Sequence, residues 1–299
     1  MADHVLAALR KLLNWHAARD DDFASPIVKG MARTKPKERA RDRTLTDDEI
    51  RALWATLDER DADAAQAAKE AGEKDGATDI FAGLVRTLLL TAQRREEVSQ
   101  LARAEIDGAG LWTIPGERNK SKKPSLVPLN KEAVATIKAQ AQVDNCDLVF
   151  TTNGKTPFSG FSKAKRQLDV VMLDKLRAVA TERKDTAWLA KLNEIPKLWE
   201  AAAKGDKKAQ LKLKRLWWTL HDLRRTGKTL MARAGVRPDI SERVLGHVLK
   251  GVEGVYDRHD YVAEKKEALE KLATMVTQIA NPPRGSNVVP LKRRKRATA

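Results

Sequence analysis

The chain has 299 residues, 42% of them hydrophobic, so it can bury a substantial core in one large domain or two smaller ones. Lysine and arginine outnumber aspartate and glutamate by 57 to 41, and the net charge of +16 favours a polyanionic partner, although charge alone does not exclude a merely soluble basic protein. A single cysteine excludes an intrachain disulfide. With no signal peptide and no apolar run long enough to span a bilayer, we expect a cytoplasmic protein without membrane association.

Residues 4 to 18 predict an amphipathic helix, because Val5, Leu9 and Leu12 recur at helical spacing. Residues 19 to 44 interrupt this pattern with prolines and a glycine, so we expect an extended linker there. The second half of this segment is basic, and a basic linker between two modules is a natural contact for a DNA backbone. The candidate DNA-binding residues of the linker are Arg33, Lys35, Lys37, Arg39, Arg41 and Arg43.

A helix is expected to begin after Thr46, because Thr46 and Glu49 stand three residues apart, as a capping box requires. The next helical region covers residues 80 to 101, with a break expected near residues 91 to 93. Two short apolar runs, 111 to 115 and 125 to 129, then flank a polar connection and predict a β-hairpin. Residues 147 to 151 are a candidate for a further short strand.

The pattern is helical again from residue 157 to 220, with a charged stretch at 181 to 215. Further helices are expected over 219 to 234, over 238 to 245 and over 262 to 279. Gly235 and Gly246 would end the first two of these helices, because glycine commonly follows a helix C-terminus. The predicted fold class is therefore mainly α-helical with a small antiparallel β-sheet (α+β).

Four polar patterns carry the chemistry. Arg94 and Glu97 stand three apart, so on a helix they share a face and the carboxylate can hold the guanidinium. His221 and Arg224 have the same spacing, and an imidazole and a guanidinium pointing together can bind an anion. A Leu-Gly-His sequence ends at His247, and Lys120 lies in the predicted hairpin connection. Each pattern alone is common and carries little weight.

In the chain order Arg, Lys, His-x-x-Arg, His, Tyr, these residues resemble the tyrosine recombinases, the phage-type integrases. The matching stretches are LLLTAQRREEVSQL, WTIPGERNKSKKPSLVPL, LHDLRRTGKT and VLGHVLKGVEGVYDRHDY. The resemblance covers about residues 40 to 280 and implies the catalytic domain of that family. Tyr256, nine residues after His247, takes the place of the family's nucleophile.

The resemblance also implies a domain organisation. Residues 1–30 would be the C-terminal remnant of a core DNA-binding domain, 31–44 a basic interdomain linker, 45–280 the catalytic domain and 281–299 a basic, disordered tail. Family integrases usually carry a full core-binding domain, so the chain would be a fragment or a shortened member. The stretch from about 178 to 216 is longer than the family's usual connection, and the sequence assigns it no function.

The chemistry implied is the cutting and rejoining of DNA through a 3′-phosphotyrosyl bond, without cofactor or metal. A free tyrosine has a pKa of about 10 and therefore needs a base or a positive field at neutral pH. The resemblance implies that Tyr256 is the nucleophile, that His221 is its base and that His247 positions the phosphate or the phenol. Arg94 and Arg224 would bind the phosphate, and Glu97 would orient Arg94. Lys120 would protonate the leaving oxygen. Lys122 is the runner-up to Lys120, and both Lys122 and Lys123 are candidate DNA contacts. Tyr261, the other tyrosine, is expected to pack or to contact DNA.

The implied partner is double-stranded DNA at the attachment sites of a phage or integrative element, with the protein at the nucleoid when bound. The resemblance implies a homotetramer on two duplexes, and the protein could be a monomer when free of DNA. Accessory DNA-bending or directionality factors are possible further partners. The amphipathic 262–279 helix would dock on a neighbouring subunit or pack in its own core. Three alternatives remain: a type IB topoisomerase-like enzyme, a noncatalytic DNA-binding integrase fragment and an RNA-binding basic protein.

Overall fold

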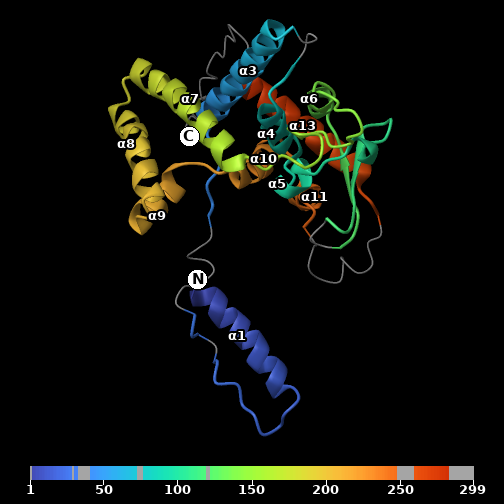
Figure 1. The fold of residues 1–299 in the computed structure, drawn as a ribbon, viewed down its shortest axis with the longest axis vertical. Helices are drawn as coiled ribbons and strands as arrows, with labels where there is room; N and C mark the ends of the chain where they lie inside the picture. Colours follow the sequence, from blue (N-terminus) through green and yellow to red (C-terminus); the bar gives the residue numbers. More distant parts are fainter. Residues whose placement is uncertain are drawn as a thin grey trace, which may run out of the picture. The chain divides into compact units, whose positions relative to one another are not determined.

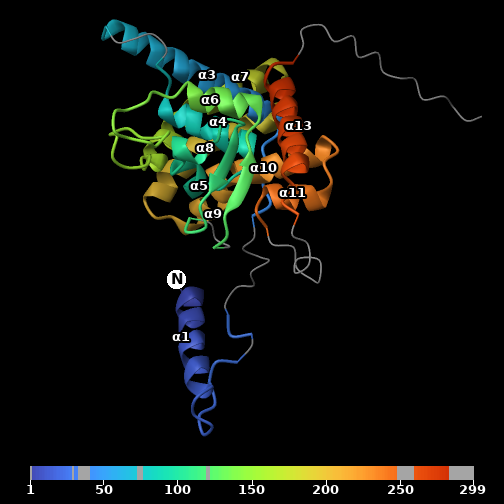
Figure 2. The same cartoon turned by 90° about the vertical axis from the view of Figure 1, so that its right-hand side faces the viewer.

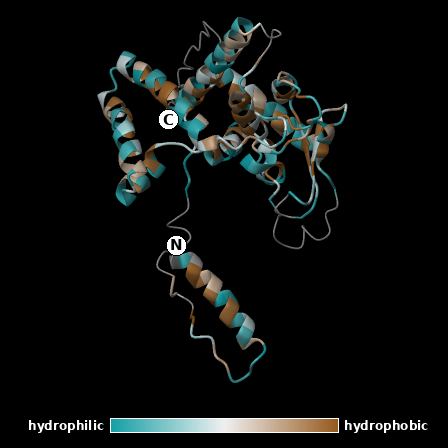
Figure 3. Ribbon diagram, viewed as in Figure 1, coloured by the Kyte–Doolittle hydropathy of each residue, from teal (hydrophilic) through white to brown (hydrophobic). Residues whose placement is uncertain are grey.

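The computed structural model describes residues 2–28, 30–32, 41–72, 77–118, 122–247 and 259–282, and it divides into two units between Asp42 and Arg43 (Figure 1). The first unit contains α1 (Ala2–Ala17), which confirms the helix predicted there. A bond of 3.1 Å from Arg10 Nη2 to the Val28 carbonyl fastens the segment that follows onto this helix. Apolar residues run along α1 (Figure 3), and Leu12 and Trp15 are 60% and 55% exposed.

The second unit is mainly helical with one two-stranded antiparallel sheet, which confirms the predicted fold class. Its strands are β1 (Leu111–Ile114) and β2 (Ser125–Pro128), with Leu111 opposite Pro128 and Ile114 opposite Ser125. Its helices are α3 (Asp47–Glu70), α4 (Ile80–Thr91), α5 (Arg95–Ser99), the short 3₁₀ helix η1 (Arg103–Glu105), α6 (Lys131–Lys138), α7 (Phe161–Glu182), α8 (Thr186–Ala203), α9 (Lys207–Leu216), α10 (Leu220–Arg233), α11 (Pro238–Val244) and α13 (Val262–Ala280).

One local expectation needs correction, and one helix was not predicted. Residues 147 to 151 do not form a strand, because Leu148 makes only an isolated bridge to Ala102. Helix α6 was not expected, although its start carries a recognisable signal: the Asn130 side chain accepts a hydrogen bond of 2.9 Å from the Ala133 amide. In the described part of the chain, no helix combines the length and the apolar character that crossing a membrane requires.

Helix α4 lies at the centre of the second unit, with α3, α6, α10 and α13 packed around it (Figure 2). Every residue from Phe81 to Thr91 is buried, so this helix is apolar on all sides rather than on one face. Arg86 interrupts that apolar run. Its guanidinium pairs with Asp61 and, at 2.6 Å, with Asp58, so that the buried charge is balanced.

Helix α13 packs within the same unit, against α3, α10, α11 and β2. Leu269, Leu272 and Val276 on its apolar face are at most 1% exposed. Of the two roles considered for this helix, the structure therefore shows core packing, and this apolar face is not available for docking onto a neighbouring subunit.

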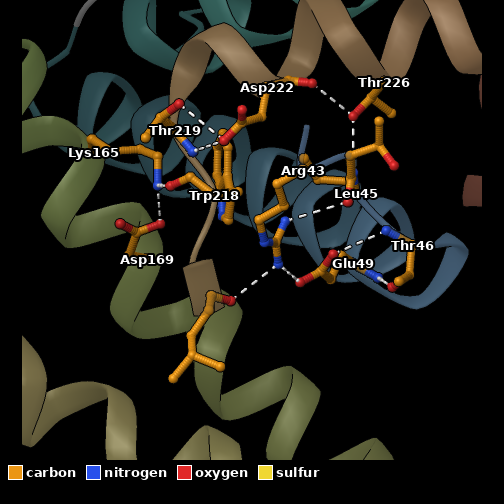
Figure 4. A network of polar contacts seen from close by, with 12 residues as sticks. Arg43, Leu45, Thr46, Glu49, Lys165, Asp169, Trp218, Thr219, Asp222 and Thr226 are labelled. Atoms are coloured by element: carbon orange, nitrogen blue, oxygen red, sulfur yellow. Dashed lines mark hydrogen bonds and ion pairs between the residues drawn. The ribbon is translucent and has the colours of Figure 1, made fainter. Parts of the chain in front are cut away.

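The segment leading into α3 is tied to α10 by a buried polar network (Figure 4). The Thr226 hydroxyl accepts a hydrogen bond of 2.9 Å from the Leu45 amide and donates one of 2.8 Å to the Asp222 carbonyl. Thr46 and Glu49 form the predicted capping box, with bonds of 2.9 and 3.2 Å. The start of the second unit is thereby fixed to the helix that carries His221 and Arg224.

Candidate active site

Arg94 lies in a sharp turn between two helices. Helix α4 ends at Ala92, which adopts the left-handed conformation with φ of 53°, and Arg94 is the N-cap of α5. The Arg94 amide and Nη1 donate to the two carboxylate oxygens of Glu97 at 2.8 and 2.6 Å. The expected ion pair is present, but Arg94 precedes the helix instead of sharing a helix face with Glu97. One carboxylate therefore orients both the backbone and the guanidinium of Arg94.

Arg224 is a buried arginine, 5% exposed, on the second turn of α10. Its Nη1 donates to the Ala92 carbonyl at 2.8 Å, and its Nη2 donates to the Leu245 carbonyl. Among the described residues no carboxylate forms an ion pair with it. Burial and then the charge of Arg94 lower the pKa of Arg224 to about 10, so the group remains a cation at neutral pH.

The end of α11 is held against the turn that contains Arg94. The side-chain amide of Gln93 donates to the Val244 carbonyl at 2.8 Å and to the Thr91 carbonyl at 2.9 Å. Gly246 follows with φ of 60°, and a Cβ at this position would lie 4.0 Å from Arg94 Nη1 and 3.9 Å from Ser125 Oγ. Three segments far apart in the sequence, ending near residues 94, 125 and 246, therefore meet at one place.

His247 is oriented by a carboxylate that the sequence pattern did not indicate. Its Nδ1 pairs with Glu242, while its Nε2 lies 3.3 Å from Arg224 Nη2. If Nδ1 carries the proton and donates to Glu242, Nε2 is an acceptor for the guanidinium. Burial alone would raise the pKa of Glu242, but the hydrogen bonds from Lys228 and His247 outweigh it and hold that pKa below its ordinary value. In the sequence, Glu242 is marked only by its position on the short helix α11 (Pro238–Val244), five residues before His247.

His221 lies in the first turn of α10, one turn before Arg224, and is exposed. Partial burial is the first cause that lowers the pKa of His221, followed by the charges of Arg225, Arg224 and Arg94, with Asp222 opposing them. The imidazole is therefore mostly neutral at pH 7, which is the form that accepts a proton. The charge of Arg94 acts on both His221 and Arg224, which indicates that the three side chains share one region.

Residues 43–261 of this chain match the family model described as the phage integrase family. The chain belongs to this family of tyrosine recombinases. It is also similar to the prophage integrase IntZ of Escherichia coli strain K12, with 27% identity over 211 residues; the alignment covers 69% of this chain but 42% of IntZ. A solved structure of an integrase from mycobacterium phage Brujita matches with a TM-score of 0.45 and 14% identity, over 93% of this chain and 76% of that one.

The remaining candidates of this integrase-family chain divide into three groups. Lys122, with φ of 59°, and Lys123 are exposed beside the hairpin. Arg43 is turned into the fold: its side chain is 16% exposed, pairs with Glu49 and donates to the Leu216 carbonyl at 3.3 Å. Arg41 is partly buried. Lys120 and Tyr256, and the linker residues Arg33, Lys35, Lys37 and Arg39, lie outside the described residues.

Tyr261, the second tyrosine, is partly buried and packs against the core. Its ring lies 3.7 Å from the guanidinium carbon of Arg243 and 4.6 Å from the ring of His259. Tyr261 also precedes α13 as its N-cap, in the left-handed conformation with φ of 51°. These contacts give it a structural position at the start of the last helix, as the packing interpretation expects.

Proposed function

We propose that this chain is the catalytic part of a site-specific DNA recombinase, which cuts and rejoins DNA through a covalent 3′-phosphotyrosyl intermediate. The proposal rests on the proximity of Arg94, Arg224 and His221. Among the described residues, no carboxylate forms an ion pair with the buried Arg224. Holding like charges together costs free energy that a bound phosphate offsets, because guanidinium groups bind phosphate oxygens with paired hydrogen bonds.

The proposed step is an in-line exchange at phosphorus. The phenolic oxygen of Tyr256 bonds to the scissile phosphate, and the bond to the 5′-oxygen breaks. His221 takes the phenolic proton, and Lys120 gives a proton to the leaving 5′-oxygen. A 5′-hydroxyl from a second strand reverses the attack, so the phosphotyrosyl bond conserves the energy and no nucleotide cofactor is consumed.

Arg94 and Arg224 would bind the non-bridging oxygens, on which negative charge accumulates in the transition state. Glu97 and the backbone carbonyls that hold Arg224 keep these donors in place before DNA arrives. His247, held by Glu242 and lying 3.3 Å from Arg224 Nη2, is suited to position the phosphate. Preorganised donors of this kind avoid reorganisation at the moment of reaction.

The decisive experiment captures the covalent intermediate. The full chain is incubated with a pool of nicked duplexes whose randomised central region samples many candidate attachment sequences. Complexes that survive denaturation are isolated, their DNA is sequenced, and the modified peptide is identified by mass spectrometry. Tyr256→Phe should abolish the adduct and leave DNA binding nearly intact, whereas the matched Tyr261→Phe should retain the adduct.

Two outcomes would contradict the proposal in different ways. An adduct on Tyr261 would overturn the choice of nucleophile. DNA binding by the wild-type chain without any adduct would make it a noncatalytic integrase fragment. If an adduct forms, recovery of exchanged strands from two labelled duplexes supports a recombinase, and relaxation of supercoiled DNA alone supports the topoisomerase alternative.

The partners are also part of the proposal. We infer that the substrate is double-stranded DNA at attachment sites, and that the protein acts as a tetramer on two duplexes in the cytoplasm. Accessory DNA-bending or directionality factors would be further partners. The division near residue 42 and the uncovered apolar side chains of α1 support residues 1–30 as the end of a core-binding domain and 31–44 as its basic linker. Residues 45–280 would form the catalytic domain, with 281–299 as a basic tail.

A further inference from the structure

A groove opens beside the candidate active site and extends away from it. It has a volume of about 830 Å³ and lies between α7, the pair α8 and α9, and the start of α10. Its lining includes Arg94 and His221 as well as residues of α8 and α9. Helices α8 and α9 lie against one another and α8 lies against α7 (Figure 1). The stretch to which the sequence assigned no role therefore builds a wall that is continuous with the proposed phosphate site.

The wall is fixed by a small aromatic core. Trp199 of α8 and Trp217 form an edge-to-face pair with ring centroids 5.8 Å apart, and their side chains are 7% and 4% exposed. Trp217 and Trp218 directly precede α10, which carries His221. The position of α8 is therefore coupled to that of the candidate catalytic helix through packed side chains.

Two of the charged residues that line the groove, Lys165 and Asp169, neutralise each other. The Lys165 ammonium pairs with Asp169, donates to the Trp218 carbonyl at 3.4 Å and lies 3.5 Å from the centre of the Trp218 ring (Figure 4). Burial lowers the pKa of Lys165 to about 8, with Asp169 opposing that shift. This pair is committed to the fold, so it supplies little net attraction for a ligand.

Two other cations of the groove are not balanced in this way. Arg166 of α7 stacks on Trp199, with its guanidinium carbon 4.3 Å from the ring centre, and Lys214 lies in the last turn of α9. Within the described ranges neither side chain forms an ion pair or donates a hydrogen bond. Stacking fixes the plane of the Arg166 guanidinium while its N–H groups remain able to bind an anion.

We propose that this groove holds the DNA backbone next to the cleaved phosphodiester, with Arg166 and Lys214 contacting its phosphates. The proposal deepens the proposed function and rests on it. Two features argue for this occupant: the unbalanced positive charge of Arg166 and Lys214, and the presence of Arg94 and His221 in the lining of the same groove. The helices α8 and α9 would then lengthen the DNA footprint along one strand.

The aromatic side chains argue against a base as the occupant. Trp199, Trp217 and Trp218 are each less than 10% exposed, and guanidinium or ammonium groups lie over the rings of Trp199 and Trp218. A base needs an open ring face for stacking. Sequence-independent phosphate contacts therefore fit the groove better than the capture of an unpaired nucleotide.

The test measures the salt dependence of DNA binding by the full chain. Fluorescence anisotropy with a labelled 30-base-pair duplex of arbitrary sequence, between 50 and 200 mM salt, compares wild type with Arg166→Gln/Lys214→Gln. The matched control is Lys191→Gln/Lys197→Gln, which removes two exposed cations of α8 that do not line the groove. Removing one cation that binds a phosphate should reduce the slope of log K against log salt by about 0.9.

The groove variant should therefore lose about 1.8 from that slope, while the control remains close to wild type. If the slope changed equally in both variants, the effect would come from net charge alone and the proposal would be overturned. A wild-type slope in the groove variant would also overturn it. If the double variant does not fold, Lys214→Gln alone, on an exposed position, should lower the slope by about 0.9. The readout is binding, so failure of the covalent-adduct assay remains distinguishable from failure of this inference.

Discussion

At the scale of single residues, the candidate site is defined by what holds each cation in place. Arg224 is anchored by the carbonyls of Ala92 and Leu245, and Arg94 by the carboxylate of Glu97. A carbonyl anchor fixes a guanidinium without neutralising it, whereas a carboxylate anchor does both. The two arginines therefore differ in how their charge is compensated, because only Arg94 is paired with a carboxylate among the described residues.

Replacing Arg224 by lysine should separate charge from geometry. Lysine keeps the positive charge but has no planar fork, so it cannot reach both carbonyls and a phosphate together. We expect a single-turnover cleavage rate lower by on the order of 10² to 10³, with DNA binding reduced much less. Arg233→Gln on the same helix removes only an exposed pair with Asp47 and should cleave at the wild-type rate. Near-normal cleavage by Arg224→Lys would exclude the bidentate role.

The titration of His221 should appear in the pH profile of cleavage. In the proposed mechanism the neutral imidazole is the base, so the rate should fall as the pH drops through its pKa. Partial burial and the neighbouring arginines hold that pKa below its ordinary value of 6.5. At subsaturating DNA, where the profile reports the free enzyme, the acidic limb should have its midpoint below 6.5. His221→Asn should lower the rate and remove this limb; an unchanged acidic limb in that variant would assign the titration to another group.

At the scale of elements, helix ends rather than helix faces assemble the site. Helix α4 stops at Ala92 in a left-handed conformation, α11 stops before Gly246, and α10 begins just before His221. These ends meet because α10 packs directly on α4. At Gly227 the two helices approach so closely that a Cβ would lie 2.9 Å from the Ala92 Cβ.

Gly227→Ala should therefore disturb both stability and chemistry. The added methyl group must push α10 away from Ala92, whose carbonyl receives Arg224. Overpacking of this kind typically costs about 1–3 kcal/mol, measurable as a lower midpoint of urea unfolding. The cleavage rate of the folded fraction should fall as well. Gly108→Ala, where a Cβ meets nothing within 4 Å, is the control and should leave both quantities nearly unchanged; equal stability of the two variants would contradict the packing argument.

At the scale of the whole molecule, the chain consists of two units that differ in how far their apolar residues are buried. The contiguous hydrophobic core draws its buried residues from Leu45 to Ile279, all within the second unit. The first unit contains one described helix with exposed apolar residues and leads into the basic segment. Folding free energy should therefore reside in the second unit, and part of the DNA affinity in the first.

Removing residues 1–42 should test this division. We expect the free energy of unfolding to change by no more than about 0.5 kcal/mol, because the truncation removes no member of the core cluster. DNA affinity at about 100 mM salt should fall, since the basic linker is removed. Leu45→Ala, just inside the second unit and 5% exposed, is the contrasting variant and should cost about 2–5 kcal/mol. A large drop in stability on truncation would show that the units depend on one another.

The sequence by itself determined the features that depend on near neighbours. Thr46 and Glu49 are three residues apart, so their capping box can be predicted from local spacing. Gly246 marked the end of a helix, and two short apolar runs around a polar connection marked the hairpin. The family was indicated by a joint order along the chain, which does not depend on coordinates: Arg94, Lys120, His221, Arg224, His247 and Tyr256.

Only the tertiary structure decided which groups meet across long separations. The bond between Arg224 and the Ala92 carbonyl spans 132 positions, and no local pattern encodes it. The same holds for the role of Glu242 at His247, for the inward turn of Arg43 and for the groove beside α8 and α9. Such contacts follow from how whole helices pack, since packing is set by the summed fit of many side chains and not by any one of them.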